Sequence, residues 1–124
     1  IQKEGDCIIT GSYLLLYRAV YNLVENAIRY NRDGGSVYVS VNKRDTNAVI
    51  DIRDTGRGIA PEYIERVFEP FFRVDKSRSR ELGGVGLGLA LVREIVRLHD
   101  GSIAVSESNE EGTTFEVVFP CETI

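Results

Sequence analysis

Apolar residues between positions 13 and 30 recur every three or four positions, which is the spacing of one face of an α-helix. Ser12 stands immediately before this segment and suits an N-cap, because its side-chain oxygen accepts a backbone hydrogen bond from the first turn. The pattern therefore predicts a helix from Ser12 to about Tyr30. The residues expected to share its apolar stripe are Tyr13, Leu16, Tyr17, Val20, Leu23, Val24, Ala27 and Ile28.

Four further segments alternate apolar and polar residues with a period of two, as half-buried β-strands do. The segments "SVYVSVNKR" (36–44) and "NAVIDIRD" (47–54), joined by "DTN", predict an antiparallel hairpin. The segments "SIAVSES" (102–108) and "TTFEVVFP" (113–120), joined by the turn "NEEG", predict a second pair of strands. A short strand is also expected in "DCIITG", before the first helix.

Two more segments predict helices. Pro61 begins the short stretch "PEYIERVFE", and "VGLGLALVREIVRLHD" is amphipathic with an expected stop at Gly101. Residues 68–84 between them form a long charged connection, and connections of this length are usually functional or disordered. The order of elements predicts an α+β fold of two layers, with helices packed on one face of a mixed, mostly antiparallel sheet.

The composition indicates a single domain over residues 1–124, because 43% of the residues are hydrophobic and no repeat or linker divides the chain. The first residue is Ile1, so we expect the chain to come from a longer protein. A net charge of −4 argues against nucleic acid as a partner. The exception is "RVDKSRSRE" (73–81), a net-positive segment that suits either a solvated loop or a nearby polyphosphate.

The glycine-rich segment "GGVGLGL" (83–89) matches neither common phosphate-binding motif. A P-loop requires Lys and Ser or Thr after its last glycine, and the Rossmann fingerprint requires a third glycine where Leu89 stands. Gly84, Gly86 and Gly88 nevertheless alternate at a helix start, where free backbone N–H groups attract an anion. The alternative is a flexible hinge, and the residues alone favour neither interpretation.

The segment "DTGRGI" (54–59) also allows two interpretations. Gly56 and Gly58 suit a tight turn with positive φ. Asp54, at the end of an apolar strand, either caps that turn or accepts a hydrogen bond from a ligand amine. Taken alone, the segment favours the turn.

Asn22 and Asn26 are unexpected inside a helix, because asparagine side chains compete for nearby backbone groups. At about 100° per residue they fall on one side, together with Arg18, Glu25 and Arg29. Either this side is merely solvated, or it presents amide oxygens to a ligand.

Five motifs appear in order along the chain: "NLVENAIRY", "DTGRGI", "FEPFF", "GGVGLGL" and "GTTF". They resemble the N box, first glycine box, F box, second glycine box and terminal Gly-Thr of the ATP-binding domains of sensor histidine kinases. This family belongs to the group with the Bergerat ATP-binding fold, shared with DNA gyrase, Hsp90 and mismatch-repair ATPases. The resemblance extends from Ser12 to Pro120.

The resemblance implies that the chain binds ATP with Mg²⁺ and assigns a role to each motif. Asn26 would offer its amide oxygen to Mg²⁺, which prefers oxygen ligands. Asn22 would contact phosphate or metal-bound water, and Arg29 would pair with a phosphate oxygen. The residues implied at the adenosine moiety are Tyr30 beside the base or ribose, Asp54 at the adenine amino group, Gly56, Gly58 and Ile59 over the base, and Thr113 at the adenine.

The connection at residues 68–84 corresponds to the ATP lid of this family. Its head would be anchored by Phe68, Phe71 and Phe72. The residues implied around the triphosphate are Lys76, Arg78 and Arg80 from the lid, and Gly84, Val85, Gly86, Leu87 and Gly88 from the second glycine box.

The resemblance favours phosphoryl transfer over ATP hydrolysis. Hydrolysing relatives place a general-base glutamate where this chain has Asn22, whose amide cannot take a proton. Glu25 is displaced around the helix, where it is either an exposed charge or a residue that polarises an acceptor imidazole. His99, at a helix end, is expected to be structural. The catalytic residues implied are Asn22, Glu25 and Asn26.

The acceptor histidine would lie on a separate dimerisation domain that these residues do not contain. The implied partners are that domain and the receiver domain of a response regulator. The ATP-binding domain itself would lie in the cytoplasmic part of a membrane-bound homodimer. Two alternatives stay open: a serine kinase of the anti-sigma type with the same fold, and a module that only senses nucleotide.

Overall fold

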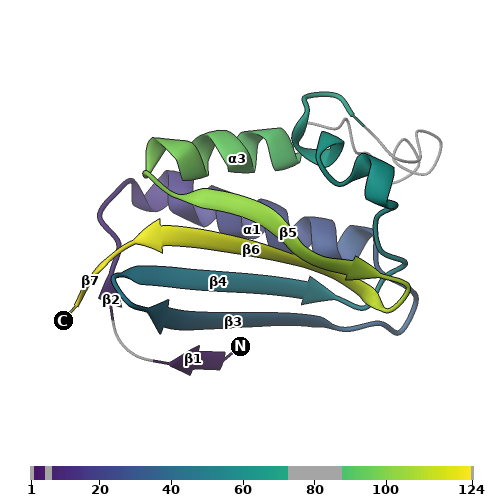
Figure 1. The fold of residues 1–124 in the computed structure, drawn as a ribbon, viewed down its shortest axis with the longest axis horizontal. Coiled ribbons are helices and arrows are strands. Elements are labelled where there is room, and N and C mark those ends of the chain that lie inside the picture. Colours follow the sequence, from purple (N-terminus) through teal and green to yellow (C-terminus); the bar gives the residue numbers. More distant parts are fainter. Residues whose placement is uncertain (1, 5–6, 73–87, 124) are drawn as a thin grey trace.

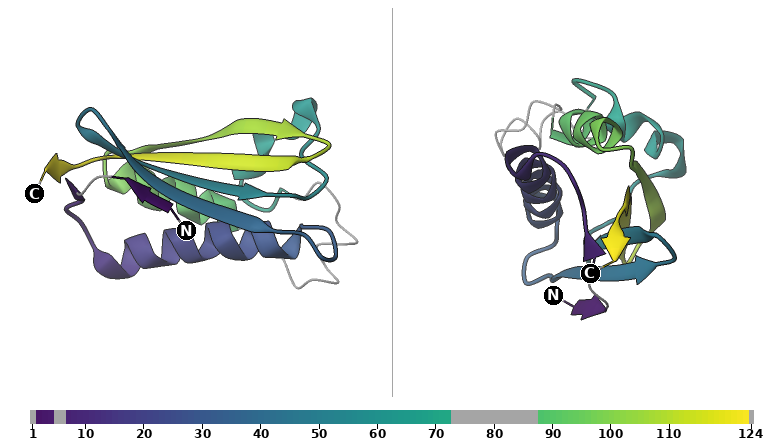
Figure 2. Two further views of the ribbon diagram at one scale, coloured as in Figure 1. Left: turned by 90° about the horizontal axis from the view of Figure 1, so that it is seen from below. Right: turned by 90° about the vertical axis from the view of Figure 1, so that its left-hand side faces the viewer.

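The computed structural model of the chain describes residues 2–4, 7–72 and 88–123. Two helices, α1 (Tyr13–Arg29) and α3 (Gly88–Leu98), lie side by side over one face of a five-stranded sheet (Figure 1). Figure 2 shows both helices on the same side of the sheet. The predicted two-layer α+β fold is therefore confirmed. None of the helices in the described ranges has the length and apolar content to cross a bilayer.

The sheet joins the two predicted strand pairs, because the second strand of one pair lies next to the second strand of the other. Its order is β1 (Gln2–Glu4), β3 (Val37–Arg44), β4 (Asn47–Asp54), β6 (Gly112–Pro120) and β5 (Ser102–Asn109). The pairing of β1 with β3 is parallel and the other pairings are antiparallel. A separate antiparallel pair consists of β2 (Cys7–Ile8) and β7 (Glu122–Thr123). Strands of two or three residues, such as β1 and β7, are too short to produce a readable alternation.

Helix α1 buries a narrower face than its apolar pattern predicted. The Ser12 hydroxyl accepts the N–H of Leu15 at 3.3 Å, which confirms the N-cap. The fully buried positions are Ala19, Leu23 and Ala27. Tyr13, Tyr17 and Ile28, expected in the buried stripe, are exposed. The small side chains at positions 19 and 27 belong to the core, while the tyrosine rings stack on one another along the outside, with 6.3 Å between the centroids of Tyr13 and Tyr17.

The stop of α3 differs in detail from the prediction. The N–H of Gly101 bonds to the carbonyl of Val96 at 2.9 Å, which satisfies a carbonyl of the last turn. The left-handed residue is Asp100, with φ 58°, rather than the glycine. Gly101 is required for space instead, because a Cβ atom there would lie 2.5 Å from the carbonyl oxygen of Val118.

The segment "PEYIERVFE" forms two separate 3₁₀ turns, η1 (Pro61–Tyr63) and η2 (Arg66–Phe68), in place of the predicted single helix. Val67 and Phe68 are both buried. Short 3₁₀ turns are common connectors, and η2 places both of these neighbours in the core. The ring of Phe68 packs edge-on against Phe115 of β6, with centroids 6.0 Å apart, and fastens this segment to the core.

The core lies between the sheet and the two helices. Its largest fully buried side chains are Phe115 and Phe119 of β6, Ile52 of β4, Leu23 of α1, and Val92, Ile95 and Val96 of α3. The aromatic rings of β6 contact the elements that cover the sheet, Phe115 through Phe68 of η2 and Phe119 through His99 after α3. The core thus holds the ends of α1, β4 and β6 in a fixed relation.

His99 connects the start of α1 to the end of α3. Its Nε2 accepts the backbone N–H of Ser12 at 3.1 Å, and its Nδ1 lies 2.7 Å from the carbonyl oxygen of Ile95. The hydrogen is therefore on Nδ1, since the two nitrogens meet a donor and an acceptor. Gly11 leaves room for the ring, because a Cβ atom there would overlap it.

We expect His99→Ala to lower the free energy of unfolding by about 1–2 kcal/mol, because two hydrogen bonds are lost together. Urea denaturation followed by circular dichroism measures the change. Leu98→Ala is the matched control, since Leu98 is the neighbouring residue and is 72% exposed. Equal midpoints for His99→Ala and wild type would contradict the structural role of His99.

Candidate functional site

Asp54 ends β4 on the face of the sheet that the helices cover. Ile52 of β4 pairs with Phe115 of β6, and both side chains point into the core. Because side chains alternate along a strand, Asp54 and Thr113, two residues beyond that pair, share the same face. Both are buried, Asp54 with 8% of its surface exposed and Thr113 with 4%. The predicted adenine-side residues therefore lie next to one another across two strands.

The carboxylate of Asp54 is held by the backbone through one of its oxygens. Oδ1 accepts the N–H of Gly56 at 2.9 Å and the N–H of Thr113 at 3.2 Å. Burial raises the pKa of Asp54 above its usual value, although the two backbone hydrogen bonds act in the opposite direction. Within the described part of the chain both bonds end on Oδ1, so Oδ2 is available to accept a hydrogen bond from a ligand.

The two glycines after Asp54 serve different purposes. A Cβ atom at Gly56 would lie 2.7 Å from the carbonyl oxygen of Tyr30 and 3.0 Å from Oδ1 of Asp54. Gly58 has φ +82°, and a Cβ atom there would overlap the carbonyl oxygen of Asn109. Positive φ, which the sequence suggested for both glycines, is thus present at Gly58, while Gly56 permits a close approach of the loop to the end of α1.

Ser108 is a polar residue of this region that the sequence did not single out. Its Oγ accepts the N–H of Ile59 at 2.7 Å and lies 3.1 Å from Oγ1 of Thr113, its partner across β5 and β6. Strict alternation from Ile103 and Val105 would turn residue 107 inward and residue 108 outward. A β-bulge between Val105 and Glu107 shifts the register and places Ser108 on the inner face. No local residue pattern marks this bulge.

The two asparagines of α1 are half-buried on successive turns of the helix. A Cβ atom at Gly88 would lie 4.0 Å from Oδ1 of Asn22, so this amide is next to the first residue described in α3. The backbone carbonyl of Asn26 accepts the N–H of Tyr30 at 3.1 Å, as the last turn of α1 requires. A neutral amide beside a helix N-terminus suits an anion, because the free N–H groups carry partial positive charge.

Glu25 and Arg29 form an ion pair with each other, with 2.5 Å between Oε1 and Nη2. The two residues are one turn apart on α1, and their side chains are partly exposed. Arg29, for which a phosphate partner was predicted, therefore has Glu25 as its partner in this structure. Glu25 is neither a free surface charge nor buried.

The predicted lid is described only at its beginning. Phe68 lies in the core, and Phe72 packs against Tyr63 with its centroid 5.6 Å away. Phe71 is 68% exposed, so the prediction that it anchors the lid is wrong. The predicted site residues that lie outside the described residues are Lys76, Arg78, Arg80, Gly84, Val85, Gly86 and Leu87.

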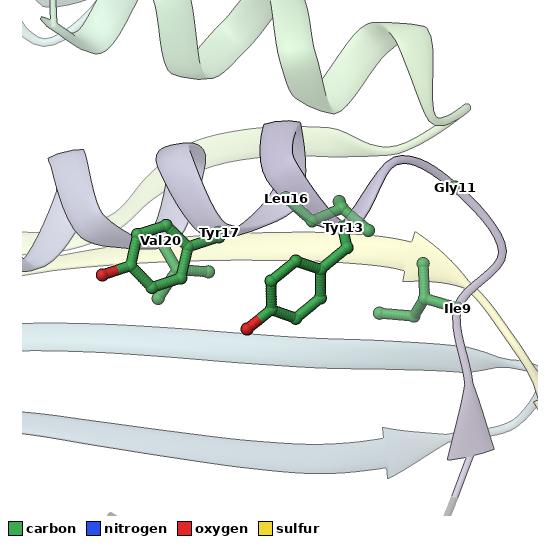
Figure 3. Close-up of a pocket in the computed structure, with 6 residues that line it drawn as sticks. All are labelled: Ile9, Gly11, Tyr13, Leu16, Tyr17 and Val20. Atoms are coloured by element: carbon green, nitrogen blue, oxygen red, sulfur yellow. The ribbon is translucent and has the colours of Figure 1, made fainter.

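A surface hollow of about 390 Å³ lies along the first half of α1, away from Asp54. Figure 3 shows the rings of Tyr13 and Tyr17 beside it, with Ile9 at its edge. Its lining consists of apolar and tyrosine side chains and one glycine. The hollow therefore has none of the charged and amide side chains that are found among the predicted site residues.

Among residues 2–4, 7–72 and 88–123, no three His, Cys, Asp or Glu side chains gather as a metal site would require. The neutral amide oxygens of Asn22 and Asn26 fit Mg²⁺, which keeps several waters and commonly shares its ligands with phosphate oxygens.

Comparison with known proteins gives a consistent result. Residues 11–123 match the family described as histidine kinase-, DNA gyrase B-, and HSP90-like ATPase. The sensor-like histidine kinase SenX3 of Mycobacterium tuberculosis is 48% identical over 112 residues, which cover 90% of this chain and 27% of that protein. The chain spans about a quarter of the length of the curated relatives it matches.

Solved structures of histidine kinases share the fold. The mycobacterial sensor histidine kinase MprB superposes with a TM-score of 0.85 at 32% identity, covering 99% of this chain and 81% of that one. Full-length ShkA in complex with AMPPNP superposes with a TM-score of 0.77 at 28% identity, covering 89% of this chain and 22% of that one.

Proposed function

The chain belongs to the histidine kinase-, DNA gyrase B- and HSP90-like ATPase family, as the catalytic ATP-binding domain of a sensor histidine kinase, and from this premise we propose its chemistry. It binds ATP with Mg²⁺ and donates the γ-phosphoryl group to a histidine on a separate dimerisation domain. The observation that carries the proposal is Asp54, a buried carboxylate held by two backbone N–H groups on Oδ1 with Oδ2 left for a ligand.

In this proposal the adenine lies against the ends of β4 and β6. Oδ2 of Asp54 accepts a hydrogen bond from the adenine amino group, and Thr113 lies beside it on the next strand. Gly56 and Gly58 keep the following loop close, so that Ile59 covers the base. Tyr30, whose carbonyl lies against Gly56, borders the adenosine from the end of α1.

The phosphates lie between α1 and the start of α3. Asn22 faces Gly88, so the amide of one helix and the N-terminus of the other approach the same anion. Asn26 would hold Mg²⁺ through its amide oxygen, and the chemistry the metal would supply is charge neutralisation at the phosphates. The resemblance also assigns to the triphosphate the lid cations Lys76, Arg78 and Arg80 and the glycine box Gly84, Val85, Gly86, Leu87 and Gly88, of which only Gly88 lies within the described residues.

The site favours transfer to an external acceptor over hydrolysis. A general base for water must be able to take a proton, and Asn22 cannot. Glu25 is paired with Arg29 in this structure, and that pair must open before either residue takes a role in phosphoryl transfer. Phosphoryl transfer requires mainly positioning and charge stabilisation, which fixed amides and a helix N-terminus supply. In the assembled kinase, Glu25 is placed to polarise the attacking imidazole, and Arg29 then turns to a phosphate oxygen.

The remaining partners are proposed from the resemblance to sensor histidine kinases. We place the domain in the cytoplasmic part of a membrane-bound homodimer that passes the phosphoryl group to the receiver domain of a response regulator. A serine kinase of the anti-sigma type is the second candidate, because it uses the same motifs. Phosphohistidine is hydrolysed in acid and phosphoserine survives, so acid treatment of the labelled full-length protein distinguishes the two. A module that only senses nucleotide would transfer no label.

Calorimetric titration with a non-hydrolysable ATP analogue tests the site directly. Wild type is expected to bind more tightly with Mg²⁺ than with EDTA. In the presence of Mg²⁺, Asn26→Ala is expected to bind the analogue roughly tenfold more weakly than wild type does, because an oxygen ligand of the metal is removed. With EDTA the two proteins are expected to bind equally.

Asn42→Ala is the matched control, because Asn42 lies on β3, at the end of that strand remote from Asp54. Its affinity should equal that of wild type under both conditions. A well-folded wild-type protein that produced no binding heat with the analogue would overturn the proposed function. An unchanged response to Mg²⁺ in Asn26→Ala would overturn the metal assignment alone.

A further inference from the structure

We propose that Ser108 is a positioning residue that makes the Thr113 hydroxyl a hydrogen-bond donor toward the bound base, and that it thereby selects adenine. The inference rests on the proposed function and adds a specificity determinant to it. Asp54, Thr113 and Ser108 form a row across the neighbouring strands β4, β6 and β5, on the face that the helices cover. The row joins the strand ends to the loop that carries Ile59.

The hydroxyl of Ser108 has a defined donor direction. One lone pair of its Oγ accepts the N–H of Ile59 at 2.7 Å, a short and therefore strong bond. Its hydrogen then has two neighbouring acceptors, Oγ1 of Thr113 at 3.1 Å and the carbonyl oxygen of Ile59 at 3.4 Å. The shorter distance favours Thr113, because the carbonyl lies at the outer limit for a hydroxyl donor.

This direction determines what Thr113 offers to a ligand. A hydroxyl has one hydrogen to donate. When the Ser108 hydroxyl donates to Oγ1 of Thr113, the hydrogen of Thr113 is not used in that bond. That hydrogen is then free to point toward the base. Thr113 is almost fully buried, so a ligand that placed a second donor against it would leave a polar group unsatisfied.

Asp54 and Thr113 together then present one acceptor and one donor. Oδ2 of Asp54 accepts, and the Thr113 hydroxyl donates. Adenine carries the complementary pair, because its 6-amino group donates and its N1 accepts. A 6-oxopurine carries the reversed pair, an accepting O6 and a donating N1–H. Ser108 contacts no part of the base in this arrangement and acts through Thr113.

The β-bulge before Ser108 is what makes the arrangement possible. Without it Ser108 would point to the outer face of the sheet, and Thr113 would have no hydroxyl partner on β5. Bulges commonly re-aim a side chain next to a functional site.

Two ATP analogues that differ at N1 and C6 test the inference. Purine riboside triphosphate lacks the 6-amino group but keeps N1 as an acceptor, whereas inosine triphosphate has N1–H and O6. We expect wild type to prefer the purine riboside compound, and Ser108→Ala to reduce that preference roughly tenfold. The ratio of ATP to purine riboside affinity should stay unchanged, because Asp54 reads the amino group.

Ser108→Thr keeps the hydroxyl and is expected to restore the preference. Ser106→Ala is the matched control, because it removes the same group from an exposed position of the same strand. An equal loss of affinity for all three nucleotides in Ser108→Ala, or an unchanged preference, would overturn the inference and leave ATP binding intact. A wild type that bound none of them would instead refute the proposed function.

Discussion

Asp54→Asn is expected to weaken ATP binding by roughly a hundredfold while the protein stays folded. The amide oxygen of asparagine can still accept both backbone hydrogen bonds that now end on Oδ1. The amide nitrogen then takes the place of Oδ2 and turns a donor toward the donating amino group of adenine. A hydrogen bond to a charged acceptor is lost and two donors meet, so the effect exceeds that of a simple deletion.

The same substitution is not expected to lower stability. Because burial raises the pKa of Asp54 above 3.8, the folded state binds this proton more tightly than the unfolded state does. The contribution of Asp54 to the free energy of unfolding therefore falls as pH rises from the unfolded pKa through the folded pKa. Asparagine does not ionise, so the variant does not lose this part of the free energy of unfolding as pH rises. At neutral pH, Asp54→Asn should therefore unfold at no lower urea concentration than wild type.

Calorimetry for ATP affinity and urea denaturation for stability measure the two effects on one sample. Asp51→Asn is the control. The pKa of Asp51 is also raised, chiefly by burial and then by Glu116, but its side chain lies on the opposite face of the sheet from that of Asp54. Asp51→Asn should bind ATP normally. Normal ATP affinity in Asp54→Asn would contradict the role given to Oδ2.

Gly112→Ala is expected to lower the free energy of unfolding by about 3 kcal/mol, the largest stability effect among these variants. Gly112 begins β6 with φ +143°, a backbone conformation that residues with a side chain rarely adopt. A Cβ atom there would overlap the backbone carbonyl oxygen of Asp54. Backbone strain and overlap therefore act together, and the junction of β4 with β6 must shift.

Gly34→Ala separates the two contributions. Gly34 also has positive φ, +75°, but a Cβ atom there has nothing within 4 Å. Its expected cost is about 1 kcal/mol, from strain alone. Thermal and urea denaturation of both variants measure the difference. Equal losses for Gly112→Ala and Gly34→Ala would contradict the larger effect expected at Gly112.

Much of the candidate site was predictable because its signals are local. Asp54 and its two glycines occur within five residues, and Asn22 and Asn26 are one helical turn apart. Backbone geometry, helix propensity and period-two alternation act over such distances, so the strands, both long helices and the two-layer order follow from neighbouring residues. The N-cap at Ser12 belongs to the same class.

Other features depend on contacts between distant residues. Which apolar face of α1 is buried depended on how the helix packs against α3 and the sheet, and this packing put Ala19 and Ala27 inside and left Tyr13 and Tyr17 exposed. The helix stop at Asp100 depended on the space that Val118 leaves at Gly101. Neither choice is visible in the local pattern.

The sequence by itself determined the two long helices, the four long strands, their order and the identity of the polar residues at the ends of α1 and β4. Only the tertiary structure decided that Asp54, Thr113 and Ser108 form one row and that Arg29 meets Glu25. The physical reason is that strand register is a property of two strands, not one. A single bulged residue on β5 reverses which side chains face inward, and its position is selected by pairing with β6.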